Sequence, residues 1–416
     1  MDKIDWVREE AKKILKEKIL NKKKSSYSTA EDDVKEVIEN YLEGVVDALV
    51  KSQKTELSKD ALVQLQDQIV NELFGFGSLE HLLDDPQITD IMINSPSQIF
   101  IEKKGEIIRL DIGFKGPSEI LGILEKMMHG TSSRINQTDP FVDFKLKDGS
   151  RVTAMVPPVT KSPAICIRKF SHEDFDLKDL VEQGSLCQKA ADFLKACIKA
   201  RLNILITGST GAGKTTLLNV LMRLVPLNER MITIEDTEEL SVPKSHHFLK
   251  LLTRQSSVEG KGEISIENLV KLSLHVRPDR IIIGEIRGEE AFYFLQAINT
   301  GHRGSMGTMH ANDAEDALIR VETLGLMAKA NIQAQVVKRF IGMGLDLVIH
   351  LMRDSKGQRL ITQIAEVTYK NDTCNIANIF HRQDIKKARK DSQDLVHTGK
   401  IPSFAEQLSS ESGWNF

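Results

Sequence analysis

The chain carries the stretch Gly208-Ser209-Thr210-Gly211-Ala212-Gly213-Lys214-Thr215 between two regular segments. The apolar run 203–207 before it reads as a buried strand, and residues 216–224 after it read as a helix. Strand, glycine-rich loop and helix in this order satisfy the P-loop pattern. Backbone N–H groups of such a loop wrap phosphates, a lysine reaches the β and γ phosphates, and a threonine hydroxyl suits magnesium. The predicted nucleotide-binding residues are Gly208, Ser209, Thr210, Gly211, Ala212, Gly213, Lys214, Thr215 and Thr216, with Thr215 also a metal ligand.

Two apolar strands end in acids that suit hydrolysis of a bound nucleotide. Residues 231–234 run into Glu235, and residues 280–283 run into Gly284 and Glu285. Hydrolysis needs one group to orient the attacking water and another to hold the metal, so we expect both acids at the carboxyl ends of neighbouring strands, beside the P-loop. Exposed strand-end acids without a role are the alternative, but two such strands behind one P-loop favour catalytic use. Common P-loop NTPases have an aspartate in place of the glycine and glutamate.

A glycine-rich cluster at residues 300–312 contains His302 and His310. Its glycines permit close backbone approach, and His310 is suited to hydrogen-bond a γ-phosphate as a sensor. A structural histidine in a loop is the alternative. Neither histidine has a cysteine or carboxylate partner at metal-ligand spacing, so a metal site there is disfavoured.

The organisation of the chain predicts three parts. Residues 1–77 show apolar positions at helical spacing, for example Val34, Val37 and Ile38, and form a helical N-terminal region. Residues 78–176 change to short β-rich runs and form a small α+β domain. Residues 177–416 alternate helices with compact apolar strands, which indicates an α/β domain with a parallel sheet.

Composition excludes several classes. The 416 residues carry a net charge of -3 and only 5% aromatic residues, which disfavours nucleic-acid binding because the chain has no global positive field, although a local basic patch stays open. The sequence has no 18-residue apolar span, and it starts without the apolar core of a signal peptide, so we expect a cytoplasmic protein. Its four cysteines form no C-x-x-C pair, so no zinc site is expected.

Together these features resemble the hexameric secretion ATPases of type II secretion, type IV pili, conjugation and archaeal flagella. The motifs that carry the resemblance are Walker A at 208–215, the Asp box at Ile234-Glu235-Asp236, an atypical Walker B at Gly284-Glu285-Ile286-Arg287, and the His box at 307–312. Features at 75–80, 148–152, 277–280 and 304–308 are similar to the CpaF/TadA branch, which drives tight-adherence (Flp) pili. The likeness covers residues 74–407, and the absent C-x-x-C motif argues against the type II branch with its zinc-binding insertion.

The resemblance implies a role for each site residue. Glu235 would polarise the attacking water, Glu285 would hold magnesium through its water shell, and His310 would read the γ-phosphate. Arg151 and Arg168 match positions from which the N-terminal domain reaches toward the phosphates; ordinary strand-surface arginines are the alternative.

The resemblance also implies a fold and partners. A RecA-like P-loop NTPase domain would follow a small α+β (PAS-like) N-terminal domain and the helical N-terminal region. The cofactors would be ATP and Mg²⁺, and the partners would be a homohexamer and an inner-membrane platform protein. The protein would lie in the cytoplasm, peripherally attached to the inner face of the cell membrane, without zinc or nucleic acid.

Three alternatives remain at the level of sequence. A RecA-like nucleic-acid translocase would need a basic groove, which the charge balance disfavours. A conjugation-type secretion ATPase shares the motifs. An ATP-regulated scaffold without turnover is disfavoured by the intact Glu235 and Glu285. Arg287 and Arg303 also stay open as arginines that neutralise the transferring phosphoryl group.

Overall fold

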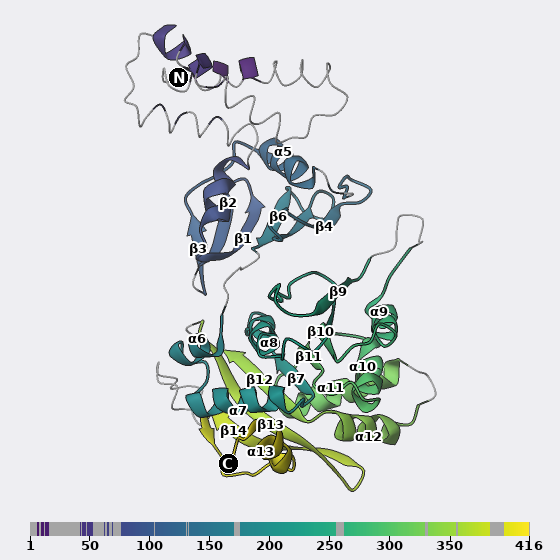
Figure 1. The fold of residues 1–416 in the computed structure, drawn as a ribbon. Helices are drawn as coiled ribbons and strands as arrows, with labels where there is room; N and C mark the ends of the chain where they lie inside the picture. Colours follow the sequence, from purple (N-terminus) through teal and green to yellow (C-terminus); the bar gives the residue numbers. More distant parts are fainter. Residues whose placement is uncertain are drawn as a thin grey trace. The chain divides into compact units, whose positions relative to one another are not determined.

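The computed structural model describes residues 76–103, 105–129, 131, 133–169, 175–254, 262–328, 332–354, 357–382 and 395–415, with scattered residues between 6 and 69 (Figure 1). Contacts divide the chain into two compact units, Met1–Ser171 and His172–Phe416. Within the part of the chain so described, no helix combines the length and apolar character needed to cross a bilayer.

The first unit contains an antiparallel six-stranded sheet in the order β3-β2-β1-β6-β5-β4. Its elements are η1 (Gly77–Leu79), α4 (Glu80–Asp84), β1 (Ile88–Ser95), β2 (Gln98–Lys103), β3 (Glu106–Leu110), α5 (Pro117–Met128), β4 (Phe141–Lys145), β5 (Arg151–Met155) and β6 (Ala164–Arg168). Alternate strand residues, such as Ile91 and Ile167, pack in one core with Ile120 and Leu124 of α5. The opposite face of the sheet carries charged side chains such as Asp90 and Arg168, together with Met92 and Phe100. This is the predicted α+β arrangement.

The helical pattern before this sheet is only partly described. Leu42, Val46 and Val50 are helical and pack with Leu65 and Ile69 in a small apolar core. Val34, Val37 and Ile38, on which the helix prediction also rests, lie outside the described residues.

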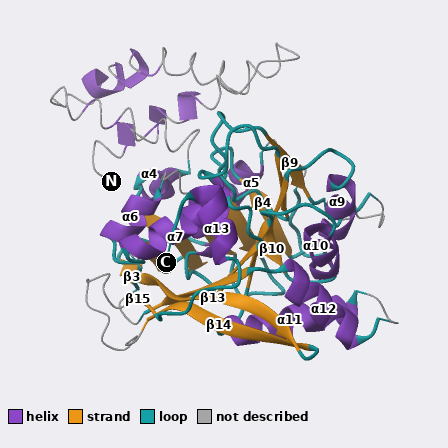
Figure 2. Ribbon diagram, turned by 60° about the horizontal axis from the view of Figure 1, so that its bottom comes forward, coloured by secondary structure: helices purple, strands orange, loops and turns teal. Residues whose placement is uncertain are grey.

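The second unit contains a nine-stranded sheet in the order β15-β14-β13-β12-β7-β11-β10-β8-β9. The strands from β12 to β9 pair in parallel, and β13, β14 and β15 add antiparallel strands at the other edge. Figure 2 shows the long strands β13 and β14 of this edge side by side. The strands are β7 (Ile204–Gly208), β8 (Met231–Glu235), β9 (Phe248–Leu252), β10 (Arg280–Ile286), β11 (Met306–Met309), β12 (Leu347–Arg353), β13 (Arg359–Lys370), β14 (Thr373–Arg382) and β15 (Leu395–His397).

Helices cover both faces of this sheet. They are α6 (Leu177–Glu182), α7 (Gln188–Lys199), α8 (Lys214–Met222), α9 (Ile266–Ser273), α10 (Glu290–Asn299), α11 (Ala314–Met327), α12 (Ala334–Gly344) and α13 (Ala405–Ser412). Ile204 and Ile206 of β7 pack with α6, α7, α8 and α13. Leu205 points to the other face and packs with α9, α10, α11 and α12. The sequence prediction of a parallel sheet with crossover helices is therefore correct for the six strands from β12 to β9.

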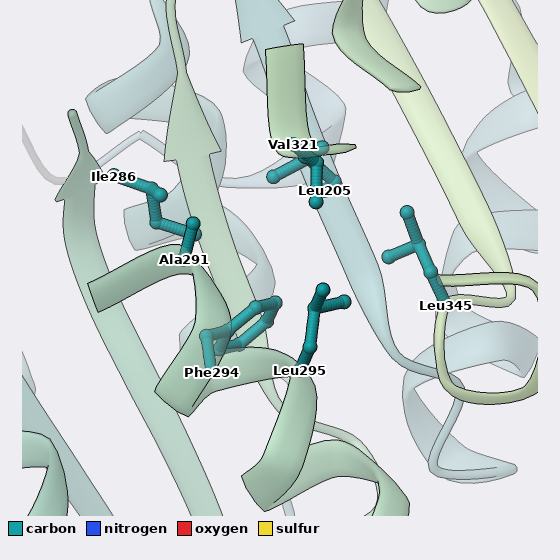
Figure 3. A pocket seen from close by; sticks show the side chains of 7 residues that line it. All are labelled: Leu205, Ile286, Ala291, Phe294, Leu295, Val321 and Leu345. Carbon is teal, nitrogen blue, oxygen red and sulfur yellow. The ribbon is translucent and has the colours of Figure 1, made fainter. Parts of the chain in front are cut away.

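The core on the α9–α12 face contains one small apolar space (Figure 3). It is lined by Leu205, Ile286, Ala291, Phe294, Leu295, Val321 and Leu345. No polar side chain points into it, so it offers a ligand or an ordered water no partner.

Strand β11 differs most from the sequence interpretation, which treats residues 300–312 as a glycine-rich loop. Residues 306–309 form a buried strand between β7 and β10. A Cβ on Gly307 would lie 2.9 Å from Ile286 Cδ1, so this glycine serves close packing between strands rather than a turn. The acid-bearing strands β8 and β10 are neighbours of each other, and β11 separates them from the P-loop strand β7.

Candidate active site

The loop from Gly208 to Gly213 joins β7 to α8 at the carboxyl end of the parallel strands. Its glycines are required by the backbone: Gly211 and Gly213 have φ angles of 72° and 95°. A Cβ on Gly208 would lie 2.4 Å from the Leu351 carbonyl oxygen of the adjacent strand β12. Ser209, Thr210 and Gly211 are exposed, whereas Thr215 and Thr216 are half-buried in the first turn of α8. The glycine conformations and the exposure of residues 209–211 are compatible with the predicted phosphate binding.

Lys214 is the first residue of α8 and folds back over this loop. Its Nζ donates hydrogen bonds to the carbonyl oxygens of Gly208 and Ser209, at 3.1 and 3.0 Å. Burial lowers the pKa of Lys214, while the charge of Glu285 opposes that shift. The ammonium is therefore held at the loop and faces an anionic partner.

Strand β10 contains an irregularity that sets the direction of Glu285. Ile283 pairs with Gly307 and Ile286 pairs with Met309, so Gly284 and Glu285 occupy one more position than β11 provides. The Thr308 hydroxyl donates to the Gly284 carbonyl oxygen at 2.6 Å and fixes the irregular segment. Such bulges re-aim side chains beside active sites. The glycine and glutamate that depart from the common pattern are the residues of this bulge.

Glu285 lies at the centre of a chain of polar contacts. Its Oε1 lies 2.7 Å from His310 Nε2, and its Oε2 accepts a hydrogen bond from Arg287. The other ring nitrogen of His310, Nδ1, lies 3.4 Å from Lys214 Nζ. Because an ammonium only donates, Nδ1 is the acceptor in its contact with Lys214, and a neutral ring then carries its proton on Nε2. The approach of Nε2 to Glu285 Oε1 does not meet hydrogen-bond geometry among the described residues. Lys214, His310 and Glu285, which the sequence predicts as site residues, are thus brought together.

The charged groups in this series of contacts shift the pKa values of Glu285 and His310. Burial raises the pKa of Glu285, but the hydrogen bond from Arg287 and the charges of Arg287, His310 and Lys214 outweigh it and hold that pKa below its usual value. Burial and the charge of Lys214 lower the pKa of His310. At neutral pH the pair is therefore a carboxylate and a neutral imidazole.

Glu235 lies at the end of β8 and is only 2% exposed. Its Oε1 accepts backbone hydrogen bonds from Glu239 and Leu240, both at 2.8 Å. Its Oε2 is buried and has no hydrogen-bond partner among the described residues. Burial raises the pKa of Glu235 to about 7, against the two backbone hydrogen bonds. One oxygen is fixed, and the other is left to accept a proton or a water.

Gly284 of β10 supplies the room for this carboxyl group. A Cβ at Gly284 would lie 3.0 Å from Cγ and 3.6 Å from Oε1 of Glu235. The two acid-bearing strands therefore meet at a glycine and a glutamate, and Glu235 lies directly against the backbone that carries Glu285.

Arg287 connects the two acidic segments. Besides its hydrogen bond to Glu285, its Nη1 lies 3.7 Å from Asp236 Oδ2. Asp236 and Arg287 also line an open pocket with residues 253–254 and 263–267. Arg303, the other arginine left open by the sequence, precedes β11 and pairs with Asp346 at 2.9 Å, at the amino ends of the strands. Of these two arginines, only Arg287 lies at the site.

Arg151 and Arg168 lie in the first unit, on adjacent strands. They are direct partners in the β5–β6 ladder. Arg168 Nε lies 3.2 Å from Asp90 Oδ1, and Arg151 Nη2 lies 3.2 Å from Asp143 Oδ2. Both side chains are accessible and already bind carboxylates, the chemistry that phosphate binding also uses.

The residues present fit magnesium. No group of three or more metal-ligating side chains occurs among the described residues. Nucleotide sites do not need one, because Mg²⁺ keeps several waters and binds one or two protein oxygens plus phosphates. Thr215 offers a hydroxyl, and Glu285 offers a carboxylate whose lowered pKa keeps it charged.

The comparisons with known proteins assign the family. A model described as "Type II/IV secretion system protein" matches residues 72–400. The chain belongs to this family. It is 32% identical over 317 residues to a protein of Mycobacterium tuberculosis (strain ATCC 25618 / H37Rv) named as a conjugal transfer protein. The aligned region covers 74% of this chain and 89% of that protein. It is 30% identical over 294 residues to the conjugal transfer protein TrbB of Rhizobium radiobacter, with 70% and 87% covered.

A solved structure supports the fold of this type II/IV secretion family member. The pilus retraction motor PilT with bound ADP matches with a TM-score of 0.52 and 22% identity, over 72% of this chain and 82% of that chain. The predicted family and the RecA-like fold are confirmed. The tight-adherence branch stays a prediction.

The roles of two residues of this site could not be predicted from the sequence. Gly284 is visible only as a departure from the common motif, and its function as the wall beside Glu235 depends on the pairing of β8 with β10. Arg287 is visible as a neighbour of Glu285, but its reach to Asp236 joins residues 51 positions apart.

Proposed function

We propose that this protein is a magnesium-dependent ATPase motor that powers pilus assembly or protein secretion. The observation that carries the proposal is the contact chain from Lys214 through His310 to Glu285, beside the buried Glu235. It joins a phosphate-binding lysine to a charged carboxylate and a carboxylate of raised pKa, the combination that phosphoanhydride hydrolysis needs.

The residues divide the chemistry between them. Glu235 accepts the proton of the attacking water on its unpartnered oxygen, while Glu239 and Leu240 hold the other oxygen in place. His310 lies between Lys214 and Glu285 and reads the terminal phosphate by donating a hydrogen bond from Nε2. Thr215 and Glu285 would hold magnesium, which would supply charge neutralisation at the phosphates.

The motor role extends the family assignment. We propose a homohexamer on the cytoplasmic face of the inner membrane, acting on a membrane platform protein, with Arg151 and Arg168 supplied by the N-terminal domain to the nucleotide. The sequence features at 75–80, 148–152, 277–280 and 304–308, which are similar to the CpaF/TadA branch, favour a motor of tight-adherence pili. A conjugation-type secretion ATPase is the second candidate, because curated relatives are named for conjugal transfer. A gene neighbourhood encoding a small pilin and a polytopic membrane protein would decide for the pilus motor.

ATP turnover of the full chain tests the proposal. We expect phosphate release that requires magnesium, and a Lys214→Ala variant that neither binds nor hydrolyses ATP. Single-stranded DNA should leave the rate unchanged. Strong stimulation by DNA would favour a nucleic-acid translocase, and magnesium-dependent binding without turnover would favour a scaffold.

A further inference from the structure

The hairpin formed by β12 and β13 ends beside the phosphate-binding loop. Leu351 of β12 pairs with Gly208, the first residue of the loop. Two positions further on, Arg353 pairs with Arg359, the first residue of β13. The sheet therefore places two arginines next to Gly211 and Gly213, although they are more than 130 positions away in sequence.

Arg359 contacts the loop directly. Its Nε donates a hydrogen bond to the Gly211 carbonyl oxygen at 3.2 Å. Its aliphatic carbons run across Gly213, where a Cβ would lie 3.2 Å from Arg359 Cδ. The left-handed glycines of the loop thus also make space for this side chain.

The backbone of Arg359 is held in place by a buried neighbour. The Ser185 hydroxyl donates to the Arg359 carbonyl oxygen at 2.7 Å, and the Ile361 N–H donates to the Ser185 carbonyl oxygen at 3.0 Å. Arg382, 1% exposed, donates through Nη2 to the carbonyl oxygens of Gly184 and Ser185. These hydrogen bonds therefore fix the backbone from which the Arg359 side chain extends.

The guanidinium of Arg359 keeps most of its donors available. A guanidinium has five N–H donors, and only the Nε of Arg359 is used by the described residues. None of the ion pairs among those residues joins Arg359 to a carboxylate, and the side chain is exposed. Arg353 Nη1 lies 3.6 Å from the position of a Cβ on Gly211 and adds positive charge beside the P-loop.

We propose that Arg359 is a further nucleotide-binding residue, supplied by the same chain as the P-loop. Its Nε holds the outer carbonyl of the loop, and its terminal Nη groups bind the phosphates of the nucleotide. This proposal rests on the proposed nucleotide binding by the P-loop, because it assigns an additional contact within that site.

Direct binding of ADP and adenosine to the full-length protein tests this role without relying on turnover. Arg359→Ala should weaken ADP binding about tenfold, as expected for loss of a charged hydrogen bond, and should leave any binding of adenosine unchanged. Arg359→Lys should recover part of the ADP affinity, since the positive charge is kept. The matched control is Arg339→Ala, which removes an exposed arginine from α12.

The outcomes separate this proposal from the proposed function. Unchanged ADP affinity in Arg359→Ala, with binding lost in Lys214→Ala, would overturn the role of Arg359 and leave the function standing. Equal loss in Arg359→Ala and Arg359→Lys, with a lowered melting temperature in the absence of nucleotide, would show a structural brace and also overturn it. Absence of ADP binding by the wild type would remove the proposed function itself.

Discussion

Gly284 and Glu235 touch across the β8–β10 pair: a Cβ on Gly284 would lie 3.0 Å from Glu235 Cγ. The glycine of the atypical Walker B motif therefore leaves the space that the side chain of the proposed base occupies. A residue with a side chain at this position would displace the carboxyl group. The acidic Glu285 is carried by the next position, where the bulge turns it toward His310.

Gly284→Ala should reduce turnover roughly tenfold to a hundredfold while ADP binding is kept. The added methyl group shifts Glu235 by a few tenths of an ångström or more, and small displacements of a catalytic group are costly. Gly122→Ala is the control, because no atom lies within 4 Å of a Cβ there and it sits inside helix α5. Wild-type turnover in Gly284→Ala would show that the contact is irrelevant to catalysis.

Glu235→Gln should bind ATP normally and hydrolyse it at least about a hundredfold more slowly, because only proton transfer is removed. Wild-type turnover should rise with pH up to a plateau above about 7, the pKa to which burial raises Glu235, since the base acts when deprotonated. A rate that is flat between pH 6 and 8 would contradict the assignment.

The same raised pKa predicts the sign of a stability effect. The folded state holds the proton of Glu235 more tightly than the unfolded state, so this group's contribution is full below its ordinary value of 4.5 and is lost as pH rises through about 7. The glutamine of Glu235→Gln does not ionise, so this loss of stability with rising pH is absent from the variant. Its melting temperature relative to wild type should increase between pH 5 and pH 8.

Glu285→Gln should raise the magnesium concentration for half-maximal turnover about tenfold, in the range seen for residues that orient bound metal. Magnesium-dependent binding of a fluorescent ATP analogue should shift in the same direction. Glu322→Gln, whose carboxylate pairs with Lys338 on the α11–α12 surface, is the control. A loss of melting temperature with unchanged magnesium dependence would make Glu285 structural.

His310→Ala should lower ATP affinity several-fold and leave ADP affinity unchanged, because a sensor of the terminal phosphate contacts only ATP. Equilibrium titration of both nucleotides, with a non-hydrolysable ATP analogue, measures this difference. Equal losses for the two nucleotides would instead point to a general effect on Lys214, whose Nζ lies 3.4 Å from the ring.

The candidate site residues that could be predicted from the sequence lie near the end of an apolar strand or in the glycine-rich loop. Glu235, Glu285 and Lys214 are predicted because strand ends and a glycine loop have local signatures. Strand β11 is missed because Gly307 reads as a loop residue, whereas it is a packing contact with Ile286. Arg359 has no local signature either, since only the pairing of β12 with β7 brings it to the P-loop.

Arg151 and Arg168 belong to the same exposed face of the first sheet. Their ladder pairing places the two residues side by side, with the guanidinium of Arg168 paired to Asp90 on β1 and that of Arg151 paired to Asp143 on β4. Arg168 is 61% exposed in its side chain, and exposed ion pairs of this kind contribute little stability. Both arginines can therefore exchange a carboxylate for a phosphate at low cost.

The ring that we propose makes hydrolysis depend on these arginines. Arg168→Ala should keep nucleotide binding and lose turnover by roughly 10³-fold, the scale of an arginine that neutralises the transferring phosphoryl group. Arg109→Ala removes an exposed arginine from the same face, on β3, and should leave turnover unchanged. Specific activity of the wild type should rise with protein concentration as hexamers form. A monomer fully active at nanomolar concentration would exclude the ring, and unchanged turnover in Arg168→Ala would remove this arginine from the mechanism.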